Sequence, residues 1–280
     1  MAGPEQSVLY YRHRLPVRIM HWINVICLTI LFMSGLNIFN AHSSLNWGKS
    51  SYDGKEPLLE IGAKMAGERI VGVTRIAGHE FETTNKLGAF YNEAGEVDLR
   101  AFPSWLTVPS TQWLAMARRW HFFFAWLFVI NGFAYVAYSV LSRHLANDLS
   151  PTKRDWRGIG RSIVDHIKFR HPKGEEATRY NVLQKLAYLA VIFILLPLVI
   201  LMGLAMSPWL NGILPGWIDL FGGRQAARTL HFVAAWLLVG FVLVHVFEVI
   251  VSGMWNHLRS MITGNYRVTL EADHETHQAR

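Results

Sequence analysis

Cysteine is almost absent from this 280-residue sequence, which contains one residue of this type, Cys27. A single cysteine cannot form an internal disulfide. It also cannot supply the ligands of a thiolate-held iron–sulfur cluster or the C-x-x-C-H motif of covalent haem attachment. Any redox group in this protein must therefore be held by ligands other than sulfur.

Charge is largely missing from four long stretches, residues 17–39, 118–141, 182–206 and 226–251, where the 51% of hydrophobic residues gather. Each stretch is long enough to cross a hydrocarbon layer of about 30 Å as a helix. The first is too long for the apolar core of a cleavable signal peptide, and no clear small-residue cleavage site follows it. We therefore expect a membrane protein with four spans, the alternative being a soluble protein with a large helical core.

Acidic residues are scarce before the first span, where Glu5 stands alone beside three arginines. Residues 143–180 hold nine Lys/Arg against five acids, whereas residues 41–116 hold seven against nine. The positive-inside rule then places both termini and the 143–180 loop in the cytoplasm, with residues 41–116 and 207–225 on the periplasmic side. The net charge of +7 is explained by this orientation, and we expect no nucleic-acid partner.

The predicted fold class is all-α, an integral membrane four-helix bundle with both termini cytoplasmic and a long periplasmic loop between helices 1 and 2. We expect residues 1–270 to form one membrane domain and residues 271–280 a disordered tail. The 41–116 loop carries Gly, Asn, Pro and Trp without clear period, which indicates a small folded cap or docking surface. The Trp-rich 207–225 connector is expected to lie flat at the membrane interface.

One motif occurs at the start of three spans. "ARRWHFFFAWL" begins at Ala117 and "ARTLHFVAAWL" at Ala227, and the two share A-R-x-x-H-F-x-x-A-W-L. "RIMHW", from Arg18 to Trp22, repeats the R-x-x-H spacing. Ionisable residues inside a membrane are costly, so their recurrence in one register indicates a function.

Four of the thirteen histidines fall inside the spans, namely His21, His121, His231 and His245. His231 and His245 are fourteen residues apart, so one helix presents them within about 40° of the same face and about 21 Å apart in height. His121 opens its span level with His231, and His21 opens its span level with His245. Two facing imidazole pairs result, and each suits the axial ligation of a haem. A histidine bonded to a neighbouring helix is the simpler alternative for any one of them.

Arginine and glycine complete the predicted haem sites. An arginine one turn before a ligand histidine can bind haem propionates at headgroup depth, Arg118 and Arg228 for the outer haem and Arg18 for the inner. Gly35 and Gly132 lie on the faces of His21 and His121, at the depth of the other haem, where a porphyrin edge needs room. The alternatives are arginines that extend to the interface and ordinary small-residue helix packing.

These segments resemble the bacterial cytochrome b561 and nickel–iron hydrogenase cytochrome b family, which includes the cytochrome b subunits of formate dehydrogenase and thiosulfate reductase. The resemblance covers all four spans and rests on "RIMHWIN", "RRWHFFFAWLFVINGF" and "RTLHFVAAWLLVGFVLVHV". It implies two non-covalent haems b with the ligand pairs above, a quinone site near the inner haem, and a multi-pass place in the bacterial inner membrane. The long 41–116 loop departs from many relatives and is similar to members that accompany periplasmic molybdopterin enzymes.

Two polar residues near the inner haem are candidates for the quinone site. Asn24 follows His21 by one turn, and Glu248 follows His245 by one turn. Asn24 could instead bond across helices, and Glu248 could lie at headgroup level. The third span has no histidine and is expected to be scaffold, bent where Pro197 removes a backbone donor.

The expected function is that of a membrane-anchoring di-haem subunit that carries electrons between a periplasmic oxidoreductase and the quinone pool. The partner, of molybdopterin or hydrogenase type, would dock on residues 41–116, and the complex could be a homo-oligomer. Bis-histidine haems have no open coordination position, so we expect an electron-transfer subunit rather than a catalyst. The alternatives are a non-redox anchor, a membrane ferric or ascorbate reductase, and a transporter with a histidine relay, although a relay would step through successive depths.

Overall fold

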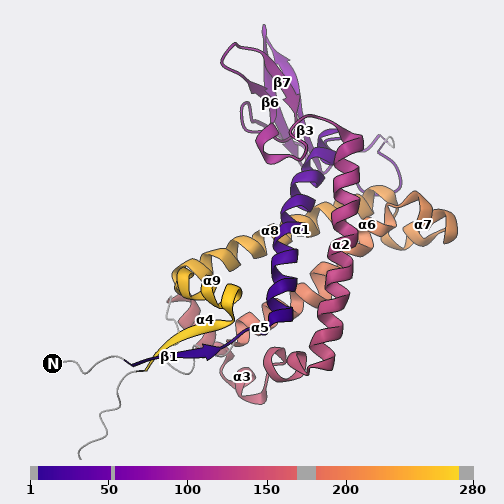
Figure 1. The fold of residues 1–280 in the computed structure, drawn as a ribbon. Coiled ribbons are helices and arrows are strands. Elements are labelled where there is room, and N and C mark those ends of the chain that lie inside the picture. The colour runs from indigo at the N-terminus through magenta and orange to yellow at the C-terminus, as the bar shows by residue number, and fades with distance from the viewer. Residues whose placement is uncertain (1–5, 52–53, 169–180, 271–280) are drawn as a thin grey trace, which may run out of the picture. The chain divides into compact units, whose positions relative to one another are not determined.

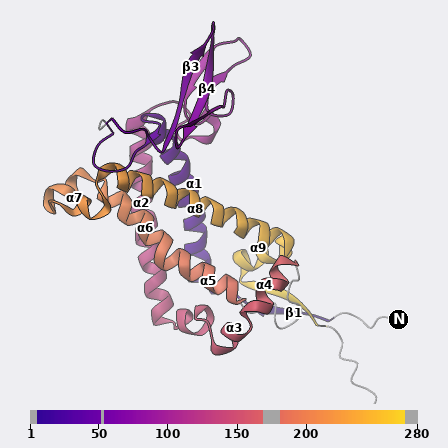
Figure 2. The same ribbon diagram turned by 180° about the vertical axis from the view of Figure 1, so that it is seen from behind.

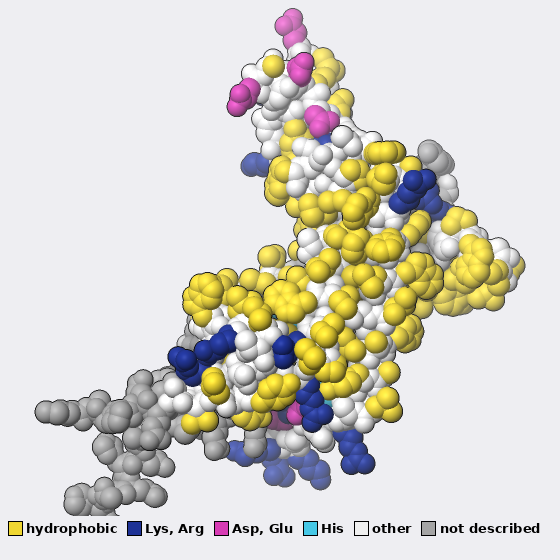
Figure 3. Space-filling model, in the orientation of Figure 1, with side chains coloured by type: hydrophobic (Ala, Val, Ile, Leu, Met, Phe, Trp, Pro, Cys, Tyr) yellow, Lys and Arg dark blue, Asp and Glu magenta, His cyan; other side chains and the backbone are white. Residues whose placement is uncertain are grey.

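The computed structural model describes residues 6–51, 54–168 and 181–270, and the predicted tail, 271–280, lies outside them. Four helices are long and apolar enough to cross a membrane: Leu15–Asn40, Leu114–Leu141, Val182–Ala205 and Arg224–Val251. Their bounds agree with the predicted spans to within four residues. The apolar windows of these helices are mostly unburied within the chain, and Figure 3 shows hydrophobic side chains covering the helices. Surfaces of this kind suit lipid.

The chain forms two compact units, and each of the four spans contributes to both. Unit 1 comprises residues 1–22, 132–194 and 239–280, and unit 2 comprises residues 23–131 and 195–238. The continuous spans are α1 (Leu15–Asn40), α2 (Leu114–Leu141) and α8 (Arg224–Val251).

The third span is interrupted. It consists of α5 (Val182–Ala190), a π-helical turn (Val191–Leu195) and α6 (Leu196–Ala205). Pro197 lies in the first turn of α6, where proline is tolerated; inside one unbroken helix over residues 182–205 its missing N–H and its ring would disrupt the helix. The π turn directly before it is a common local adjustment at such a position.

The segment between α1 and α2, which we call the cap (residues 41–113), is folded as β-structure, so the expectation of an all-α protein is wrong for it. One antiparallel sheet has the order β2-β3-β4-β5 (Ser44–Leu45, Leu59–Ala66, Arg69–Ile76, His79–Glu82). A separate hairpin pairs β6 (Gly88–Tyr91) with β7 (Val97–Arg100), and a 3-10 turn, Ser104–Leu106, follows. Two-residue turns connect β3 to β4 and β4 to β5.

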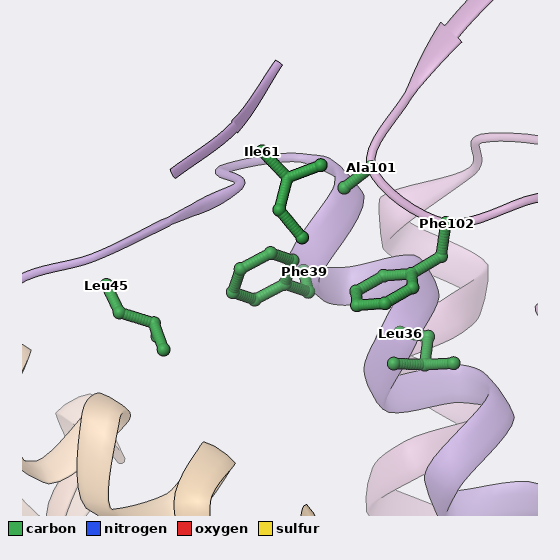
Figure 4. Packing of buried hydrophobic residues seen from close by; sticks show 6 residues of the cluster. All are labelled: Leu36, Phe39, Leu45, Ile61, Ala101 and Phe102. Atoms are coloured by element: carbon green, nitrogen blue, oxygen red, sulfur yellow. The ribbon is translucent and has the colours of Figure 1, made fainter. Parts of the chain in front are cut away.

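The cap is packed onto the C-terminal end of α1 (Figure 1). A buried apolar cluster joins the two: Leu36, Phe39, Leu45, Ile61, Ala101 and Phe102 (Figure 4). The return to α2 is fixed by buried polar groups, because Asn37 Nδ2 donates to Pro109 O (2.6 Å) and Thr111 O (2.9 Å). Buried Arg100 donates to Thr107 Oγ1 at 3.0 Å and Phe102 O at 2.8 Å. These contacts bind the cap to the helices of unit 2.

A further departure from the all-α expectation lies in unit 1. There β1 (Gln6–Tyr11) pairs antiparallel with β8 (Asn265–Leu270), directly after α9 (Met254–Thr263). The pairing brings the segments before the first and after the last span together, as an even number of spans requires. That this side is cytoplasmic stays a prediction.

Between α2 and residue 168, the described part of unit 1 has short helical segments: a π turn (Leu145–Leu149), α3 (Lys153–Arg157) and α4 (Ile159–Ile167). They gather near α5, α9 and β1 (Figure 2). Asp155 of α3 pairs with the buried Lys185 of α5 at 3.0 Å, which ties the loop after α2 to the third span.

The connector between α6 and α8 forms α7 (Pro208–Ile213) and a 3-10 turn (Trp217–Phe221). Trp209 and Leu220 expose 73% and 75% of their surface. Large exposed apolar side chains suit the interfacial position predicted for this connector, which stays a prediction.

Candidate functional site

The structure brings the four intramembrane histidines together in the two predicted pairs. His121 of α2 and His231 of α8, the outer pair, have ring centroids 6.2 Å apart. His21 of α1 and His245 of α8, the inner pair, have ring centroids 6.4 Å apart. The outer pair lies within unit 2 and the inner pair within unit 1.

Both spacings fit a metal ion between the rings. Two imidazoles that bind one metal from opposite sides, with bonds of about 2.0 Å and roughly 1.1 Å from nitrogen to ring centre, have centroids about 6.2 Å apart. Among the described residues, no group of three or more His, Cys, Asp or Glu could hold a metal. A metal with two protein ligands needs its other ligands from a non-protein group, and the porphyrin of haem supplies four.

The outer pair is held from behind by hydrogen bonds to Nδ1. His231 Nδ1 donates to Val199 O of α6 at 2.8 Å, and His121 Nδ1 lies 3.1 Å from Ser34 Oγ of α1. A hydrogen bond at Nδ1 fixes the tautomer of a neutral imidazole and leaves Nε2 available as a ligand. Neither Ser34 nor Val199 was singled out from the sequence.

Two glycines lie against the outer pair. A Cβ at Gly35 of α1 would lie 3.4 Å from His121 Cε1, and one at Gly203 of α6 would lie 3.3 Å from His231 Cε1. Gly35, which is predicted to make room for a porphyrin edge, lies against the His121 imidazole, and its role toward a porphyrin stays a prediction. The sequence does not indicate Gly203, because the third span has no histidine and is expected to be scaffold. At Gly132, an added Cβ would meet no described atom within 4 Å.

The inner pair is surrounded by aromatic rings. Phe241 stacks on His245 with centroids 6.1 Å apart and ring planes 14° apart, and Trp22 meets His21 edge-on at 5.6 Å. Tyr188 of α5 contacts Phe241 in turn. His21 Nδ1 is buried and has no hydrogen-bond partner among the described residues. The inner pair therefore differs from the outer in the support of its ligands.

The three predicted propionate arginines have different surroundings. Arg18 donates to Ile262 O in the last turn of α9, beside Trp22 Nε1, which donates to Met261 O at 3.2 Å. Arg228 donates to His42 O, and its guanidinium lies 5.6 Å from the Phe39 ring centroid. Because a guanidinium has five N–H donors, one carbonyl contact leaves others for an anion.

The third arginine of the motif, Arg118, has its guanidinium 5.6 Å from the centroid of the Phe122 ring. No ion pair involves Arg18, Arg118 or Arg228 within the part of the chain that the structure describes. Propionate binding by the three stays a prediction.

The quinone candidates lie on α1 and α8. Asn24 Oδ1 accepts from Asn131 Nδ2 of α2 at 2.7 Å, which is the contact across helices considered as the alternative for this residue. Glu248 lies one turn beyond His245 in α8. A role of either residue in quinone binding stays a prediction.

Two histidines next to the spans, His13 and His42, have pKa values below the ordinary value for histidine. Burial, and then the charge of Arg12, lowers the pKa of His13 to about 4. Burial, and then the charge of Arg228, lowers the pKa of His42. Both imidazoles are therefore neutral at pH 7.

Comparison with known proteins places these sites in context. The sequence matches the family model described as prokaryotic cytochrome b561 over residues 12–264. A relative from Azospira oryzae, provisionally named protein-methionine-sulfoxide reductase subunit YedZ1, is 34% identical over 134 residues. The match spans 48% of this chain and 65% of the relative, slightly under two thirds of its length. No solved structure matches the chain significantly.

Proposed function

The chain belongs to the prokaryotic cytochrome b561 family, and on that premise we propose that it is a membrane-anchoring di-haem subunit linking a periplasmic oxidoreductase to the quinone pool. Membership itself implies haem b, transmembrane electron transfer and a multi-pass position in the bacterial inner membrane. The number of haems, their ligands, the quinone and the partner belong to the proposal.

The observation that carries the proposal is the pairing of imidazoles from separate helices at two places. We assign His121 and His231 to one haem b and His21 and His245 to the other, on centroid distances of 6.2 and 6.4 Å. A haem with two imidazole ligands supplies one-electron transfer without an open coordination position for substrate. In the outer pair, the Nδ1 contacts with Val199 O and Ser34 Oγ leave Nε2 of each ring available as a ligand.

The periplasmic partner is proposed to dock on the cap. Trp47, Trp105 and Trp113 are all more than half exposed there, and tryptophan is enriched in protein interfaces and their hot spots. Acidic side chains also gather on the cap (Figure 3). The relative from Azospira oryzae is named as a reductase subunit, which supports an oxidoreductase partner. The molybdopterin or hydrogenase type of this partner is part of the proposal.

The quinone is proposed to react beside the inner pair. Glu248 can exchange the protons that quinone chemistry requires. Asn24 accepts from Asn131 through Oδ1, which leaves its Nδ2 to donate to a quinone carbonyl, but an amide has no proton to exchange. Glu248→Gln should therefore slow quinol-dependent haem reduction more than Asn24→Ala. The reverse order would remove Glu248 from the site.

Single histidine substitutions test the ligand assignment. In purified full-length protein, His231→Ala and His245→Ala should each lose one of two haems b, measured as haem per chain by the pyridine haemochrome. His79→Ala, on exposed strand β5, is the matched control and should keep both. If both span variants retain two haems with unchanged spectra, the assignment is wrong.

Reduction by quinol separates an electron-transfer subunit from a passive anchor. A short-chain quinol should reduce the haems of the purified protein, and Glu248→Gln should slow this reaction without loss of haem. Protein that holds two haems but exchanges no electrons with quinol would favour an anchor.

A further inference from the structure

The two histidine pairs differ in what lies behind the ligands, and the difference centres on Ser34. Ser34 is fully buried in α1. Its Oγ lies 2.6 Å from Ile30 O, 3.2 Å from Leu31 O and 3.1 Å from His121 Nδ1. Three polar atoms therefore surround a hydroxyl group that has one proton.

The direction of the Ser34–His121 hydrogen bond follows from that proton. The two carbonyl oxygens can only accept, so the hydroxyl proton is directed to Ile30 O, the nearer of the two. The Ser34 oxygen is then the acceptor in its contact with His121, whose ring also has a hydrogen bond to the backbone of Leu31, and the proton of the ring is on Nδ1. The ring is held as the Nδ1–H tautomer, and its Nε2 carries a free lone pair.

We infer that Ser34 is a positioning residue that fixes the tautomer of His121 and lowers the midpoint potential of the outer-pair haem; this inference rests on the proposed haem ligation. An acceptor at Nδ1–H increases the electron density that an imidazole donates to a metal. Stronger donation stabilises ferric over ferrous iron, so the potential falls.

The same arrangement on the opposite ligand strengthens the inference. His231 Nδ1 donates to Val199 O at 2.8 Å, so both outer-pair ligands are hydrogen-bonded in the same sense. In the inner pair, His21 Nδ1 is buried without a partner among the described residues. Ser34 is the side chain of this arrangement that can be removed by substitution, because Val199 contributes only its backbone.

Ser34→Ala tests the inference, with Thr29→Ala as the matched control. Thr29 lies on the same helix, and its hydroxyl donates to Val25 O at 2.8 Å. The readout is a spectroscopic redox titration of purified full-length protein with both haems. Ser34→Ala should raise one midpoint potential and leave the other unchanged. A tenfold change in ferric over ferrous preference, of the size that outer-shell hydrogen bonds produce, corresponds to about 59 mV.

Four further results bear on the inference. Unchanged potentials in a Ser34→Ala protein that keeps both haems would overturn the inference without touching the ligand assignment. An equal shift in Thr29→Ala would also overturn it. If Ser34→Ala loses a haem, Ser34→Thr, which keeps the hydroxyl, should retain it at the wild-type potential. Loss of the haem in Ser34→Thr as well would overturn the inference, because a variant that keeps the hydroxyl should keep the haem.

Discussion

Gly203 of α6 lies directly behind His231 of α8, so that a Cβ at residue 203 would be 3.3 Å from the imidazole Cε1. The third span, which has no histidine, thereby limits the position of His231, a proposed ligand on the fourth. On this side, the His231 ring packs against Gly203, where the absence of a side chain leaves room for it. The ring also donates a hydrogen bond to Val199 O.

Enlarging Gly203 should displace the His231 ring. Gly203→Val should lose the outer-pair haem, because the added methyl groups would overlap the imidazole, a clash worth about 1–3 kcal/mol. Gly240→Val is the control, since a Cβ there meets nothing described within 4 Å. Haem per chain measures both, and two haems in Gly203→Val would show that this contact is not tight.

Arg118 should tune one haem, whereas its neighbour Arg119 should not. Removing a positive charge beside a haem makes the added electron less stable, so Arg118→Gln should lower the midpoint potential of the outer-pair haem. Arg119→Gln is the control: it removes one positive charge at the next residue, which is outside the R-x-x-H spacing, and should leave the potential unchanged. Equal shifts in the two variants would speak against a propionate contact of Arg118.

The apolar cluster between the cap and α1 should dominate the stability of the cap. Phe102 is buried there, and replacing a buried phenylalanine by alanine costs about 3–5 kcal/mol. Phe102→Ala should therefore expose the cap to protease at lower temperature than wild type. Phe81→Ala, at a half-exposed position of β5, should behave as wild type, and an equal effect would mean that the cluster does not hold the cap.

His13 should make unit 1 sensitive to acid. Its pKa in the folded protein is about 4, below the value of about 6.5 in an unfolded chain. The unfolded state therefore binds more protons between these values, and stability is lost as pH falls through that window. The Tm of wild type should fall more between pH 7 and pH 4 than that of His13→Asn. Parallel curves for the two proteins would contradict a buried neutral His13.

The spans and the histidine pairs could be predicted because both depend on the geometry of one helix at a time. Length fixes which segments cross a membrane. The fourteen-residue spacing of His231 and His245 places them at two depths on one face of α8. His21 and His121, near the N-terminal ends of α1 and α2, complete the two pairs.

The strands of the cap were missed although the sequence carries a local signal for them. Glycine occurs in both two-residue turns, as Gly67 before Glu68 and as Gly78 after Ala77. Ala77 and Gly78 have φ values of 47° and 81°, as the two central residues of a tight hairpin turn require. The apolar and polar residues of β3 and β4 alternate too weakly for a strand pattern to stand out beside four membrane helices.

The support behind the ligands could not be predicted, because it depends on how helices are rotated against one another. Ser34 and Gly203 are ordinary small residues within apolar segments. The packing of α1 against α2 brings Ser34 to His121 as a hydrogen-bond partner. The packing of α6 against α8 places Gly203 beside His231, where a larger residue would meet the ring. Arg18 likewise acquires a carbonyl partner, Ile262 O, from the far end of the chain.

Near-infrared magnetic circular dichroism of the oxidised, full-length protein, combined with haem quantification, tests the central claim most directly. The account predicts two low-spin haems b per chain, each with the charge-transfer signature of two neutral imidazole ligands. A single haem, or a signature of one imidazole with another ligand, would contradict it.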